Sequence, residues 1–266
     1  MPPAAVQHTS PPLAPDTLGL LSGTAGLTVL DIGANPNTVG LNVVDVGPQA
    51  RLAYGVDWQP TNCGPSGTWT IAPCDDPGTQ RKTGDRPIWD HFDPVLVWAS
   101  DECELSEPAA ELEQRAKHLL RLKAERYLGE HVAGELAERA ALLPGTAGLA
   151  EAVGALEAEL ASTGHRGIIH ADRALLAPAA ALNLVVRDPL ALMTPGGSRW
   201  VFSAGYNSLD TTLYATGPVT VWRDQPVVTY AVQHEINEHQ AVAEQHLAAG
   251  WECPETAFAV TFGGGS

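Results

Sequence analysis

Residues 234–239, HEINEH, place two histidines and two glutamates within one short segment. Zinc prefers such ligands, and the H-E-x-x-H motif of zinc proteases sets its histidines four residues apart on one helix face. Here His234 and His239 are five residues apart, so on a helix they would point roughly 140° away from each other. We therefore expect an exposed polar face. The pairs His234 with Glu238 and Glu235 with His239 could still share a face, as a weak metal site or a pH-sensitive pair.

Other polar residues do not converge on an active site. His170, in the apolar run IIHAD, is expected to be a hydrogen-bonded histidine of the core or of a sheet edge. The sequence contains no G-x-S-x-G elbow and no phosphate-binding loop. We therefore expect no catalytic residue, no metal site and no cofactor. The competing interpretation is a metal-dependent hydrolase that uses His170, His234, Glu235 and His239.

The four cysteines, Cys63, Cys74, Cys103 and Cys253, form no C-x-x-C pair. Four are also too few for a disulfide scaffold in a chain of this size. The sequence therefore predicts reduced, structural cysteines.

Composition narrows the class of protein. The chain has 266 residues, of which 44% are hydrophobic, which is ample for a packed core. The net charge of −16 argues against electrostatic capture of nucleic acid by the whole surface. No apolar run is long enough to span a bilayer, and the first residues lack the pattern of a secretory signal. We expect a protein made in the cytoplasm that contacts no membrane.

One long helix is predicted over residues 106–132. Ser106 is placed to cap it, and Pro108 falls in the first turn, where a missing N–H costs little. A rise of 1.5 Å per residue makes this helix roughly 40 Å long, so other elements must lie across it. Its buried stripe is expected at three- and four-residue spacings, at Leu112, Ala116, Leu119, Leu120, Tyr127 and Leu128.

The segments before this helix are extended. Residues 1–18, rich in proline and alanine, predict an arm, and strands are expected at residues 27–32 and 41–46. Residues 54–87 carry many turn signals around one strand at 68–72, which predicts a long functional loop. Its Trp58 and Trp69 are expected to be buried, either on a neighbouring subunit or on their own domain.

After the long helix, a second helix is predicted over residues 148–162, with Leu149, Val153, Leu156 and Leu160 as its buried stripe. A short buried strand at 167–170 and a short helix follow. Residues from 183 onward are typical of strands, 234–249 of a helix or a bulged strand leading into one, and AFAVTF of a closing strand. The predicted fold class is mixed α+β.

The order of these elements resembles that of the major capsid proteins of tailed bacteriophages, of the Hong-Kong-ninety-seven-like type, and of the related encapsulin shell proteins. The segment LSEPAAELEQRAKHLLRLKAERYLGE resembles the spine helix of that family with its lead-in. GIIHADRALLAPAAALNLVV is similar to its strand and short helix, and LMTPGGSRWVFSAGY to a later strand and return. The resemblance covers roughly residues 46–262. The chain is short for the family, and its loop between Cys63 and Cys74 is unusual.

The resemblance implies a phage major-capsid-like architecture. An N-terminal arm would cover residues 1–45 and an extended-loop region 46–95. A peripheral domain with the spine helix would cover 96–150 and 220–266, and an axial domain 151–219. The implied function is a structural virion protein that self-assembles into an icosahedral shell enclosing the DNA genome, without enzymatic activity. An encapsulin-like shell and a minor virion protein are the alternatives.

The implied partners are further copies of the chain, in hexamers and pentamers, together with scaffolding, portal or decoration proteins. Packaged DNA would be enclosed without sequence-specific binding, and the mature location would be the virion. We expect inter-subunit contacts at Trp58, Trp69, Lys82 and Trp89. Some capsids of this family cross-link a loop lysine to a neighbour's asparagine. Lys82 is the only lysine in the loop, and we expect no such cross-link.

Overall fold

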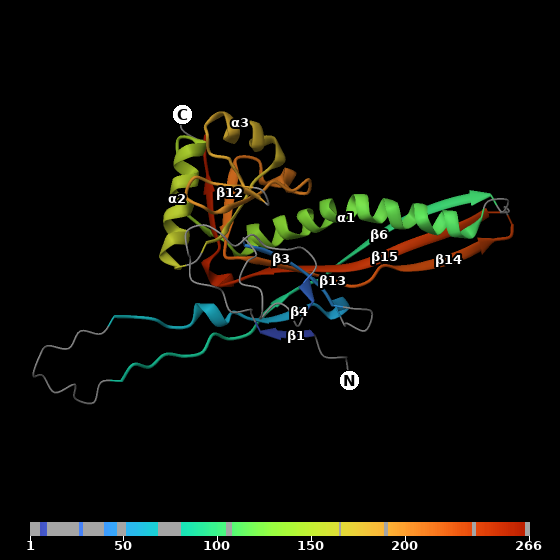
Figure 1. Ribbon diagram of the computed structural model, residues 1–266, viewed down its shortest axis with the longest axis horizontal. Coiled ribbons are helices and arrows are strands. Elements are labelled where there is room, and N and C mark those ends of the chain that lie inside the picture. Colours follow the sequence, from blue (N-terminus) through green and yellow to red (C-terminus); the bar gives the residue numbers. More distant parts are fainter. Residues whose placement is uncertain are drawn as a thin grey trace, which may run out of the picture.

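The computed structural model describes residues 6–9, 27–28, 40–46, 52–68, 81–104, 108–164, 166–188, 191–235 and 238–263. These residues form a long helix, shorter helices and three sheets, which agrees with the predicted α+β class. Figure 1 shows the long helix α1 lying along the strands β6, β14 and β15, with α2 and α3 gathered at the other end of the molecule. No helix in this part of the chain is long and apolar enough to cross a membrane.

The helix α1, Ala109–Arg139, has 31 residues and is therefore about 46 Å long. Its N-cap is Pro108, and the expected cap Ser106 lies outside the described residues. Leu112, Ala116 and Leu120 are fully buried, as the periodicity predicts, whereas Leu119 is half-buried and Tyr127 is exposed. The buried face continues past the predicted end of the helix, through Gly129, Val132, Ala133 and Leu136.

A six-stranded sheet lies against α1, in the order β14-β15-β13-β3-β2, with β6 pairing the outer part of β15. Residues 234–249 are expected from the sequence to form a helix or a bulged strand leading into one. The helix is wrong, because Glu238–Trp251 form the strand β15. It pairs with β6 on one side and β14 on the other, and Ala241, Ala243 and Leu247 alternate inward to the cluster under α1. The bounds are β2 Leu27–Thr28, β3 Leu41–Asp45, β6 Val95–Glu104, β13 Val219–Arg223, β14 Val227–Gln233 and β15 Glu238–Trp251.

A second sheet has seven strands in the order β7-β16-β12-β8-β11-β10-β9 and packs against α2, Leu149–Ser162. The predicted stripe of α2 is buried in full, and the strand expected at residues 167–170 is β8. The closing strand β16 belongs to this sheet, so residues 258–261 pack with the segment 151–219. The bounds are β7 Ala141–Leu142, β8 Ile168–His170, α3 Leu176–Ala181, β9 Val186–Asp188, β10 Ala191–Met193, β11 Arg199–Val201, β12 Thr212–Thr216 and β16 Phe258–Thr261.

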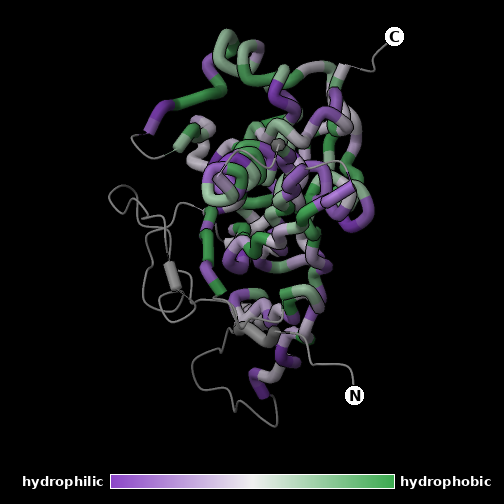
Figure 2. The backbone as a smooth tube through the Cα atoms, turned by 90° about the vertical axis from the view of Figure 1, so that its right-hand side faces the viewer, coloured by the Kyte–Doolittle hydropathy of each residue, from purple (hydrophilic) through white to green (hydrophobic). Residues whose placement is uncertain are grey.

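The third sheet, β1-β4-β5, closes the opposite side of the core. Seen along the long axis, the layers stack from the α2 and α3 end down to this small sheet near the N-terminus (Figure 2). Trp58, Phe92, Trp222 and Trp251 fill the space between it and the six-stranded sheet. The bounds are β1 Val6–Thr9, β4 Val56–Gln59 and β5 Asp90–Phe92, with 3-10 turns η1 Leu52–Tyr54, η2 Thr61–Cys63, η3 Arg173–Leu175, η4 Tyr206–Leu209 and η5 Pro254–Thr256.

Candidate functional site

An extended loop leaves the molecule between β4 and β5. Its two limbs, residues 61–68 and 81–89, run together away from the body, at lower left in Figure 1. Residues 64–68 and 81–86 are exposed, Lys82 among them. The limbs touch each other, because a Cβ added to Gly84 would lie 1.9 Å from Cγ of Pro65. Trp69, Cys74 and most of the strand expected at 68–72 lie outside the described residues.

The first limb is joined covalently to the C-terminal part of the chain. Cys63 forms a disulfide with Cys253, 190 residues away. Beside it, the Asn62 N–H donates to Oε1 of Glu252 at 3.1 Å, and that carboxylate side chain is only 1% exposed. The prediction of reduced cysteines is therefore wrong for this pair, because the fold places the turn before η5 against the loop base. Cys103 is buried and lies outside this disulfide, as expected.

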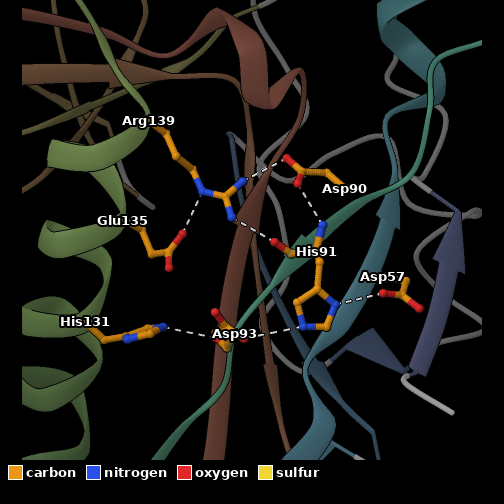
Figure 3. A network of polar contacts seen from close by, with 7 residues as sticks. All are labelled: Asp57, Asp90, His91, Asp93, His131, Glu135 and Arg139. Atoms are coloured by element: carbon orange, nitrogen blue, oxygen red, sulfur yellow. Dashed lines mark hydrogen bonds and ion pairs between the residues drawn. The ribbon is translucent and has the colours of Figure 1, made fainter.

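The strand β5, which forms the base of the second limb, is held by Arg139, the last residue of α1 (Figure 3). Its guanidinium donates to Glu135 at 2.7 Å, to Asp90 at 2.9 Å and to the carbonyl oxygen of His91 at 2.8 Å. It also lies over the Phe92 ring, 4.8 Å from the centroid. Burial acts to lower the pKa of Arg139, but the carboxylates of Asp90 and Glu135 outweigh it and raise that pKa.

His91 extends this network to the small sheet. Its Nδ1 lies 2.8 Å from Oδ1 of Asp57 on β4, and its Nε2 lies 3.5 Å from a carboxylate oxygen of Asp93. The backbone oxygen of Asp93 is in turn 3.1 Å from Nε2 of His131 on α1. Figure 3 shows how these side chains converge from β4, β5 and α1. A single polar cluster thus joins α1 to the base of the loop. The sequence does not predict these contacts.

The candidate contact residues differ in accessibility. Trp58 is 1% exposed and packs edge-on against Trp222, with ring centroids 5.1 Å apart. Trp58 therefore has almost no surface with which to contact a neighbouring subunit. Of the two environments expected for it, a neighbouring subunit or its own domain, the structure shows its own domain. Trp89 is 44% exposed and the adjacent Ile88 is 85% exposed. These two apolar side chains lie on the second loop limb.

A further apolar surface lies on the face of the β6-β15-β14 ribbon that points away from α1. Residues directly opposite in antiparallel strands share a face, and Glu244 of β15 is paired with Trp98 of β6 and Val227 of β14. Their neighbour Ala243 faces α1, so this row faces outward. Trp98 is 60% exposed and Val227 is 62% exposed, with the half-exposed Leu96 beside them. None of these residues is among the inter-subunit contacts expected from the sequence.

The residues of the alternative hydrolase do not form a site. His170 is buried in the seven-stranded sheet, with Nδ1 2.8 Å from the Tyr206 hydroxyl and Nε2 2.9 Å from Oγ1 of Thr216. The expectation of a hydrogen-bonded core histidine is confirmed, and burial lowers its pKa to about 3. His234 and Glu235 lie exposed in the turn after β14, and His239 is on β15, in contact with the Tyr230 hydroxyl.

Within the described residues, the side chains with metal-ligand spacing are Cys63, Glu252 and Cys253. Two of these three are joined in the disulfide.

No protein-family model matches the sequence, and no curated protein is similar to it. The structure is similar to that of the bacteriophage PhiM1 mature capsid, with 14% identity, coverage of 96% of this chain and 93% of the other, and a TM-score of 0.49. A structure of Mycobacterium phage Che8 has 12% identity, coverage of 71% and 81%, and a TM-score of 0.45. The holo-SrpI encapsulin complex from Synechococcus elongatus PCC 7942 has 9% identity, coverage of 66% and 76%, and a TM-score of 0.48. Phage capsids and an encapsulin are thus among the solved structures to which this chain is similar.

Proposed function

We propose that this protein is the subunit of an icosahedral shell, a phage major capsid protein, and that it acts through geometry and not through catalysis. The observation that carries this proposal is the pair of apolar surfaces that a single subunit leaves uncovered. One is Ile88 and Trp89 on the projecting loop, and the other is Leu96, Trp98 and Val227 on the outer face of the ribbon. A monomer gains nothing from either surface, whereas repeated copies bury both.

The two surfaces also complement each other in charge. The limb 81–86, RKTGDR, has three basic residues and one aspartate, hence a net charge of +2 in a chain whose net charge is −16. The outer face of the ribbon carries Glu102 and Glu244 beside the apolar residues, by the same pairing that places Trp98 there. The second limb of one subunit therefore docks on the ribbon of the next, with an apolar centre and a charged rim.

The division into arm, extended loop, peripheral domain and axial domain follows from this function. The contacts at Lys82 and Trp89 become inter-subunit contacts in hexamers and pentamers, and Trp69 belongs to the same loop. The DNA genome is enclosed without sequence-specific binding, because a chain with a net charge of −16 does not attract it strongly. An encapsulin-like shell would use the same subunit contacts around a protein cargo.

The test is assembly of the purified protein, followed by electron microscopy and sedimentation velocity. We expect closed shells or capsomers from the parent protein. Trp89→Ala and Trp98→Ala are expected to stay folded but to need at least about tenfold more protein to assemble, because each shell repeats the lost contact many times. Trp58→Ala is the matched control, since it removes a core tryptophan and is expected to unfold instead.

A charge exchange sharpens this test. Lys82→Glu should weaken assembly, and Glu102→Lys in the same chain should restore it if the two surfaces meet. A parent protein that stays a discrete monomer or dimer at all concentrations would contradict the proposed function. Unchanged assembly of both tryptophan variants would contradict the docking of the loop on the ribbon.

A further inference from the structure

We infer that Cys63 and Cys253 form a redox-operated staple of the extended loop. The pair would be open as two thiols while the subunit is in a reducing interior and closed once a low-molecular-weight disulfide oxidises it. This inference rests on the proposed function only in the use of the loop as an assembly arm.

The Cys253 side of the pair is held in place by bonds that do not involve sulfur. Its backbone is left-handed, with φ 54°, a conformation that a non-glycine residue keeps only where its surroundings impose it. The N–H and the hydroxyl of Thr256 each donate to the Cys253 carbonyl oxygen at 2.8 Å. The preceding Glu252 N–H donates to the Pro218 carbonyl at 2.9 Å. The turn therefore presents Cys253 to the loop base before any disulfide exists.

The Cys63 side is positioned in the same way. The Cys63 N–H donates to the Pro60 carbonyl oxygen at 3.2 Å, which closes the turn η2. The Asn62 N–H donates to the buried carboxylate of Glu252, the residue next to Cys253. With both turns set, the two Cα atoms lie 5.6 Å apart, within the range that a disulfide requires. Oxidation therefore closes the pair without rearranging the chain, and reduction opens it without unfolding the turns.

The two cysteines differ in solvent exposure, and this difference decides which of them reacts first with the small disulfide. Cys63 is half-buried at the foot of an exposed limb, whereas Cys253 is 4% exposed. The Cys63 thiolate attacks the small disulfide and releases one small thiolate. The Cys253 thiolate then attacks the Cys63 sulfur of the mixed disulfide and releases the second. The two cysteine protons end on the two small thiols, and the small disulfide accepts the two electrons.

Closure changes how firmly the loop is held. The second limb is bound to α1 by the Arg139 network in either redox state, because that network contains no sulfur. The first limb gains a covalent link to the C-terminal segment only on oxidation. The closed staple thus fixes both limbs at their base and removes the loop's freedom to swing about the second limb. An assembly arm that stiffens after leaving a reducing compartment can adjust during assembly and be rigid afterwards.

The experiment uses the full chain, expressed in a reducing cytoplasm and quenched in lysate with an alkylating agent. Mass spectrometry of tryptic peptides is expected to show Cys63 and Cys253 alkylated. After treatment with glutathione disulfide, the peptides are expected to be linked to each other. Limited trypsin cleavage in the limb, after Arg81 and Lys82, should be at least about fivefold slower in the oxidised subunit than in the reduced one.

Two variants serve as controls. Cys63→Ser should abolish the response of cleavage to glutathione disulfide, whereas Cys103→Ser, which removes a cysteine in a separate core cluster, should keep it. A link already complete in the quenched protein, no link after oxidation, or equal cleavage rates would each overturn the inference. All of these readouts use the free subunit. Failure of the subunit to assemble would therefore count against the proposed function and leave the staple standing.

Discussion

Removal of the Arg139 guanidinium is expected to loosen the extended loop from the spine helix. Arg139→Ala deletes the hydrogen bonds to Glu135, Asp90 and the His91 carbonyl, and the contact over the Phe92 ring. The Glu135 carboxylate, whose side chain is only 14% exposed, then keeps its charge without this partner. Truncation of one member of such a pair costs more than the pair itself contributes.

The magnitude follows from these contacts. Hydrogen bonds to charged groups contribute roughly 1.5–3 kcal/mol each when buried, and the stacked guanidinium roughly 1 kcal/mol more. Arg139 is a quarter exposed, so solvent screening reduces this sum. We expect the free energy of unfolding to fall by about 3 kcal/mol. For a chain of this size that corresponds to a fall in Tm of roughly 5 °C. Arg139→Lys should retain part of the stability, because an ammonium group lacks the planar fork.

The assay is urea unfolding followed by circular dichroism, together with trypsin cleavage of the limb after Arg81 and Lys82. Arg126→Ala is the matched control, since Arg126 lies on the same helix and also pairs with a glutamate four residues away, but its side chain is 53% exposed. We expect no measurable change in the control and faster loop cleavage in Arg139→Ala. Equal stability of the two variants would refute the assignment of Arg139 as the anchor of the second limb.

Three further predictions concern the core. Burial lowers the pKa of His170 from 6.5 to about 3, so unfolding takes up a proton between these values and stability falls as the pH drops below about 6.5. Between pH 7 and pH 5 His170 should lower the free energy of unfolding by about 2 kcal/mol. This contribution should be absent in His170→Gln when the unfolding of both proteins is measured at the two pH values. Leu120→Asp should prevent folding, judged by soluble yield and helix content, while Leu122→Asp, at a side chain that is 60% exposed, should fold normally. Gly129→Ala should destabilise the protein by about 2 kcal/mol or more, because its Cβ would lie 2.2 Å from the Ser203 hydroxyl. At Gly134 on the same helix an added Cβ would meet open space, so Gly134→Ala should stabilise the protein by up to about 1 kcal/mol. Thermal melts of both variants measure these changes.

The helices were readable from the sequence because their signals are local. The spacing of Leu149, Val153, Leu156 and Leu160 predicts a helix that buries this face. In the structure these residues lie in α2 and are buried. The spine helix is equally plain from its period, although its end was placed too early. The short apolar run before His170 likewise predicted a buried strand. The layout of these elements was enough to show the resemblance to shell proteins.

Residues 234–249 show where local signals fail. Glutamate, glutamine and alanine favour a helix there, yet Glu238–Trp251 form the strand β15, because β6 and β14 offer backbone partners on both sides. The sequence also does not decide which tryptophans are exposed and able to contact another subunit. Trp58 and Trp98 are the same residue type in strands of similar composition, but Trp58 is 1% exposed and Trp98 is 60% exposed.

The sequence by itself therefore determined the periodic elements, the fold class and the presence of a long projecting loop, since each depends on residues close together in the chain. Only the tertiary structure decided which parts of the chain meet. It paired Cys63 with Cys253, brought Arg139 to Asp90, and pressed Gly129 but not Gly134 against another segment. These contacts join residues far apart in sequence, and no local pattern encodes them, because they depend on how whole elements pack.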